Sequence, residues 1–154
     1  MSEVERIRDQ LRRAFHGEAW HGPSVREVLD GVTAKQAASR PFAGGHSIWE
    51  LVHHITAWTD ISRRRLAEDR VPEATAEEDW PPVDGADEES WRKDLHELFA
   101  SQERLQELLK SFPEPRLEAT VPGQAYTFYV MLHGAVQHGL YHAGQVAILK
   151  KAKA

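Results

Sequence analysis

The sequence lacks cysteine altogether, which excludes disulfides, thiolate metal ligands and a cysteine nucleophile. It also lacks any run of about 18 apolar residues, and its start, MSEVERIRDQ, is too polar for a signal peptide. Basic charge is not in excess: 24 Asp and Glu against 19 Lys and Arg give a net charge of −5. This balance does not favour nucleic acids or anionic membranes as partners. We therefore expect a soluble cytoplasmic protein with no nucleic-acid or membrane partner.

Strand signals are scarce too, because no segment alternates apolar and polar residues over more than about five positions. Helical spacing is present instead. Four longer helices are expected, around Val4–Phe15 and over residues 47–69, 87–112 and 125–151. Residues 70–86, rich in proline and acidic residues, are expected to form a long surface loop, and a short extended piece is expected near Leu117–Val121. The sequence predicts an all-α four-helix bundle with long crossover loops, in one domain over residues 1–154.

Four S/T-x-x-E/Q patterns predict where helices begin. They start at Ser2, Ser24, Thr33 and Ser47. Glu50 belongs to the last of these patterns and lies one turn before His54, so it reaches that side chain only from the rim. Capping is the simpler role for Glu50. With no other convincing general base, the catalytic residues stay unassigned.

Histidine is abundant, with nine in the chain. At about 100° per residue, His138 and His142 lie about 40° apart on the last helix, in the middle of its apolar stripe. His133 points away from that stripe. On the second helix His54 lies on the flank of the apolar face, whereas His53 lies opposite that face. The angular positions on the two helices therefore place three histidines, His54, His138 and His142, on inward faces, unlike the other six.

Three imidazoles from two facing helices can surround one ion. His138 and His142 are neighbours on one face, and His54 faces them from the second helix. Neutral imidazole suits Zn, Ni, Fe and Cu, and three protein ligands with an open position are typical of catalytic metal sites. The alternative is that the buried histidines satisfy neighbours or carbonyls and bind nothing.

Three further residues are candidates for shaping a pocket at this site. Trp58 lies one turn from His54, and Tyr141 and Gln145 lie beside the His138/His142 pair. Gln145 can orient a bound water or an imidazole; equally, all three can be ordinary core residues. The acidic residues of 73–89 are expected to form a solvated loop. Four other histidines are expected at the surface, namely His16, His21, His46 and His96.

Two stretches resemble the DinB-like superfamily of metal-binding four-helix bundles: HSIWELVHHITAW (46–58) and HGLYHAGQVAILKK (138–151). WHGPS (20–24) is similar to the connection before the second helix in many members. The resemblance implies one divalent metal ion held by a histidine of the second helix and by both histidines of an H-x-x-x-H on the last. By position these are His54, His138 and His142. Zn and Ni are the first candidates for the metal, followed by Fe and Mn.

The resemblance also implies classes of activity. Some relatives are transferases or isomerases that use a low-molecular-weight thiol, others are described as metal-dependent hydrolases, and homodimers are typical. We therefore expect a small-molecule substrate, with any thiol supplied as a cosubstrate because the chain has no cysteine. Two alternatives stay open: a non-enzymatic bundle protein whose metal is structural or sensory, and a helical partner-binding module without metal.

Overall fold

The computed structural model describes residues 1–152, which form seven α-helices, one 3-10 helix and no strand. The elements are α1 (Glu3–His16), α2 (Val25–Leu29), α3 (Ala34–Ala38), α4 (Ile48–Ala67), α5 (Ala76–Asp79), α6 (Glu88–Lys110), η1 (Glu114–Glu118) and α7 (Phe128–Lys151). Among these residues, no helix combines the length and the apolar character that crossing a membrane requires. The prediction of an all-α chain is confirmed.

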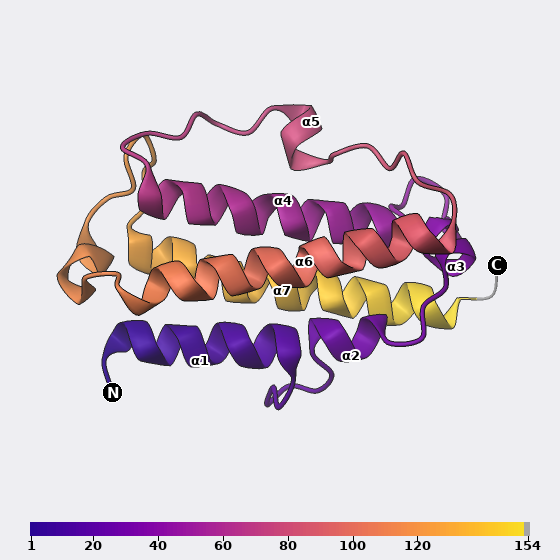
Figure 1. Cartoon of the computed structure of the whole chain (residues 1–154), viewed down its shortest axis with the longest axis horizontal. Helices are drawn as coiled ribbons and strands as arrows, with labels where there is room; N and C mark the ends of the chain where they lie inside the picture. Colours follow the sequence, from indigo (N-terminus) through magenta and orange to yellow (C-terminus); the bar gives the residue numbers. More distant parts are fainter. Residues whose placement is uncertain (153–154) are drawn as a thin grey trace.

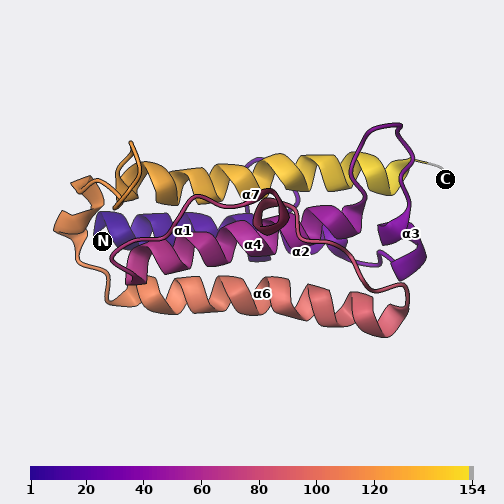
Figure 2. The ribbon, with the colours of Figure 1, turned by 90° about the horizontal axis from the view of Figure 1, so that it is seen from above.

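Four long helices, α1, α4, α6 and α7, lie side by side along the molecule, and α2 continues the line of α1 (Figure 1). Helices α4 and α1 each pack against both α6 and α7, so α4 and α1 occupy diagonal corners of the bundle. Helices α4 and α6 run in the same direction, and the chain between them must therefore return along the whole bundle. Figure 2 shows this crossover, with α5 in it, passing over α4.

The predicted caps form the helix starts. Full capping boxes open α1, α2 and α4, at Ser2, Ser24 and Ser47. At α4 the Glu50 carboxylate accepts the backbone N–H of Ser47 at 2.7 Å, and the Ser47 hydroxyl accepts that of Glu50 at 3.1 Å. Each bond satisfies a backbone group that the first turn leaves unpaired. The capping role of Glu50 is confirmed.

The crossover between α4 and α6 differs from the solvated loop that the sequence predicts. It contains a turn of helix, α5, which opens with its own capping box at Thr75. Val71 is buried, and Trp80 is half-buried against the hydrophobic core. The crossover therefore packs against α4, which explains why α4 has buried residues on more than one side.

The segment before α7 also differs from the prediction. The extended piece expected near Leu117–Val121 is shorter than predicted, because Leu117 and Glu118 belong to η1 and only Thr120 forms an isolated antiparallel bridge, with Thr127. The Thr127 hydroxyl accepts the backbone N–H of Val130, which starts α7 at Phe128 rather than at residue 125.

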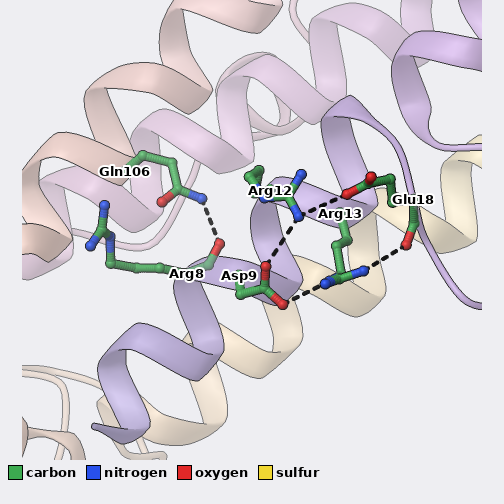
Figure 3. Close-up of polar contacts among 6 residues, drawn as sticks. All are labelled: Arg8, Asp9, Arg12, Arg13, Glu18 and Gln106. Atoms are coloured by element: carbon green, nitrogen blue, oxygen red, sulfur yellow. Dashed lines mark hydrogen bonds and ion pairs between the residues drawn. The ribbon is translucent and has the colours of Figure 1, made fainter. Parts of the chain in front are cut away.

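Polar contacts fix α1 against its neighbours (Figure 3). The Gln106 amide donates to the Arg8 carbonyl at 2.9 Å, which joins α6 to α1. Arg13 donates to the Asp9 carboxylate at 2.7 Å and to the Glu18 carbonyl at 3.1 Å. Glu18 has a φ of 65°, in the left-handed region, and these contacts hold the turn that leads from α1 toward α2.

Candidate metal centre

Three imidazoles converge between α4 and α7. The Nε2 atom of His138 lies 3.0 Å from Nε2 of His54 and 3.1 Å from Nε2 of His142. His54 and His142 are buried, and His138 is half-buried. Among the His, Asp and Glu side chains of residues 1–152, these three histidines form the group that lies close enough together to hold a metal ion. The convergence is the one that helix phase predicts.

Hydrogen bonds at the far side of the rings fix their tautomers. Nδ1–H of His54 donates to the backbone carbonyl of Asp79 at 2.6 Å, and Nδ1–H of His142 donates to Oε1 of Gln145 at 2.6 Å. A neutral imidazole with a proton on Nδ1 presents a bare lone pair at Nε2. Two lone pairs therefore point at the Nε2 atom of His138, which can donate a proton to only one of them. A cation at this point would satisfy all three nitrogens.

The environment keeps the three rings uncharged. Burial, reinforced by the neighbouring His142 and His54, lowers the pKa of His138 from 6.5 to about 3. Burial is also the largest cause that lowers the pKa of His54 and the pKa of His142. Neutral imidazole is the form that binds metals, so the rings need not lose protons at neutral pH to act as ligands.

The spacing of the nitrogens also fits an ion. Two nitrogens each about 2.0–2.1 Å from a zinc ion lie about 2.9 Å apart at a right angle and about 3.4 Å apart at the tetrahedral angle. Two of the three separations, 3.0 and 3.1 Å, fall within that range, and the third, between His54 and His142, is at most 4.8 Å. Donor type, protonation and spacing thus agree, and the cluster can hold a divalent metal ion.

The crossover supplies two residues that the sequence analysis missed. The Asp79 carboxylate accepts the Trp58 indole N–H at 2.7 Å and lies 3.3 Å from Nδ1 of His54. The Trp80 ring stacks on the imidazole of His54, with centroids 3.9 Å apart and planes 8° from parallel. The expectation that the acidic residues of 73–89 are solvated is therefore wrong at Asp79. A tryptophan among acidic residues and prolines was the available signal, since large aromatics seldom stay solvated.

Two of the predicted pocket residues contact the site, and the third lies on its outer side. Gln145 holds His142, as described above, and Trp58 lines a cavity of about 310 Å³ together with His138. Tyr141 is 67% exposed and meets His142 only at a ring-to-ring distance of 5.0 Å, outside that cavity.

The other histidines lie outside the cluster, although several are not simple surface residues. His53 contacts the Asp94 carboxylate at 2.8 Å, His133 is half-buried 4.0 Å from Glu3, and the His46 ring stacks on Trp80 at 3.5 Å. Tertiary packing, rather than helix phase, decides how these side chains are covered.

A comparison with protein-family models gives a match. A family model described as the DinB superfamily matches residues 19–146, more than four-fifths of the chain. No curated protein and no solved structure matches. The matched region contains His54, His138 and His142, together with Asp79 and Gln145, which hold two of the three rings. On this match, and with an all-helical structure that agrees with it, the chain belongs to the DinB superfamily.

Proposed function

We propose that the chain is an enzyme that uses one divalent metal ion held by His54, His138 and His142. The observation that carries the proposal is the cavity of about 310 Å³, of which His138 forms part of the wall. A small molecule in this cavity would lie beside the ion. Zn and Ni are the first candidates for the metal, followed by Fe and Mn, because imidazole ligands suit several of these ions.

The reaction class that fits is hydrolysis, or transfer of a low-molecular-weight thiol to an electrophile. A divalent ion on three neutral imidazoles supplies a Lewis acid with open positions, where water or a thiol gives up its proton more readily. The side chains around it position the ligands. Gln145 and the Asp79 carbonyl fix two rings, and Trp80 keeps water from one face of His54. Any sulfur must come from a cosubstrate, since the chain has no cysteine.

The alternative is a structural or sensory metal in a bundle without catalysis. The burial of His54 and His142 and the Trp80 stack favour this second candidate, because structural sites are closed. The cavity at His138 favours the enzyme, as does the composition of the cluster, which within the described residues has no fourth His, Asp or Glu.

The test is turnover by protein without a His tag, loaded with Zn, Ni, Fe or Mn. Esters, amides and electrophile-plus-thiol pairs serve as substrates. We expect at least one class to turn over, His54→Ala to abolish the activity, and His21→Ala to keep it, because His21 is exposed and outside the cluster. Activity that survives His54→Ala contradicts the proposal. Bound metal without turnover in any class supports the structural or sensory alternative.

Two further predictions belong to this proposal, a homodimer and a cytoplasmic location. The homodimer is supported by the apolar side chains that α7 exposes, Val130 at 54%, Tyr141 at 67% and Ile148 at 61%. Light scattering coupled to gel filtration should give twice the chain mass, and cell fractionation tests the location. A monomer across the accessible concentration range would contradict the dimer.

A further inference from the structure

One side chain in the wall of the cavity is a buried cation with incomplete partners. Arg65, near the end of α4, is 3% exposed. Its Nη1 donates to the Tyr126 hydroxyl, whereas its Nε and Nη2 atoms are buried without a hydrogen-bond partner. The nearest carboxylate, Glu73, lies 3.8 Å from Nη2, too far for a hydrogen bond, and is 75% exposed. A buried guanidinium with two free donors carries a large desolvation cost, which a bound anion would offset.

The two free nitrogens identify the kind of anion. Nε–H and one N–H of Nη2 lie on the same edge of the planar guanidinium and point in parallel, as a carboxylate with two oxygens requires. The Tyr126 hydroxyl accepts from Arg65 and so keeps its own proton for another acceptor. The hydroxyls of Thr59 and Ser62 already donate to backbone carbonyls of their own helix. A single cation suits a singly charged carboxylate better than a phosphate dianion.

The rest of the wall is suited to an apolar body. Phe15, Trp58, Val130, Met131 and Ala135 line the cavity, and Gly134 adds open space, because a Cβ built there meets no atom within 4 Å. The cavity is also long. On α4 the wall runs from Trp58 to Arg65, a rise of about 10 Å along the helix, and on α7 it runs from Val130 to His138, about 12 Å. An elongated ligand with its charge at Arg65 would present its other end to His138.

We infer that this cavity binds elongated, largely apolar monocarboxylates, with the carboxylate at the Arg65 guanidinium and the opposite end beside His138. As the substrate class of the reaction, this inference rests on the proposed metal-dependent function. As a binding site, it stands on Arg65, Tyr126 and the apolar wall alone, and it can therefore be tested in metal-free protein.

The experiment compares octanoate with octanamide, a neutral molecule of the same length, by calorimetry and by tryptophan fluorescence on the metal-free chain. We expect octanoate to bind about tenfold or more tightly than octanamide, because hydrogen bonds to a charged pair are the strong ones. Arg65→Met should remove that preference. Arg64→Met, which changes a neighbouring arginine paired with Glu68, should keep it.

Gly134→Leu tests the same cavity independently, in case Arg65→Met does not fold. The leucine side chain fills the cavity and leaves the arginine in place. It should abolish binding of both compounds. Equal binding of octanoate and octanamide to the unaltered chain, no binding of either, or octanoate binding that survives both Arg65→Met and Gly134→Leu would each overturn the inference.

The metal is titrated in a separate experiment, so the two proposals can fail independently. Octanoate binding by a chain that takes up no metal in that titration would leave the carboxylate site standing and refute the metal-dependent reaction. Metal binding and turnover without octanoate binding would support the metal-dependent reaction and refute the carboxylate site. In metal-loaded protein, substrates with a terminal carboxylate should have the higher kcat/KM, and Arg65→Met should remove that advantage.

Discussion

Replacing Gln145 by leucine removes the oxygen that accepts the Nδ1 proton of His142. The hydrogen bond is 2.6 Å long and half-buried, so water does not simply take over its role. Without an acceptor at Nδ1, the ring is free to rotate and to move its proton to Nε2, the atom that faces the other two imidazoles. Loss of such a partner behind a metal-bound histidine costs roughly 10- to 100-fold in metal affinity. At about 1.4 kcal/mol per tenfold, this corresponds to roughly 1.4–2.8 kcal/mol.

The assay is competition for Zn²⁺ or Ni²⁺ with a chromogenic chelator at pH 7.5. Gln145→Glu keeps an acceptor at the same place and should retain or raise the affinity. Gln137→Leu makes the same exchange at an exposed position of the same helix and should change nothing. The reasoning would be refuted if Gln145→Leu changed the affinity by less than about twofold, well under the range expected for a lost partner. An equal loss in Gln137→Leu would refute it too.

Two other predictions concern stability. Gly139→Ala should lower the free energy of unfolding by about 1–3 kcal/mol, because the added Cβ would lie 2.8 Å from the buried ring of Phe15, whereas Gly144→Ala, where a Cβ meets nothing within 4 Å, should raise it by up to about 1 kcal/mol. Thermal melts of both variants decide this, and melting temperatures that shift in the same direction would contradict it. The lowered pKa of His138, about 3 against 6.5 in the unfolded chain, means that the unfolded state binds the extra proton. The metal-free protein should thus lose roughly 2 kcal/mol as the pH falls from 8 to 5, most of it below pH 6.5, and less in His138→Ala. Urea titrations across that range measure this loss, and a pH-independent difference between the two proteins would count against the argument.

The part of the site that lies on regular helices could be predicted from the sequence. His138 and His142 share a stripe because the helical period places residues four apart on one face, whatever surrounds the helix. The same argument separates His54 from His53. The long helices follow from local apolar spacing, and three of the four predicted capping boxes form in full. At Thr33 only the side-chain half of the box is present.

The part supplied by irregular chain could not be predicted in this way. Asp79 and Trp80 reach His54 from a crossover without periodicity, so their contacts depend on how the segment folds across α4. Arg65 is missed for a related reason. It stands in a run of three arginines that looks solvated, and only packing against the segment around Tyr126 buries it while its two neighbours stay partly exposed.

The metal centre requires that three imidazoles hold one divalent ion. Elemental analysis and native mass spectrometry of protein purified without a His tag test it most directly. We expect about one transition-metal ion per chain in the unaltered protein and in His21→Ala, and its loss in His138→Ala, with the helical circular-dichroism signal retained. Unaltered protein that takes up no stoichiometric metal, or His138→Ala that binds it with unchanged affinity, would refute the three-histidine site.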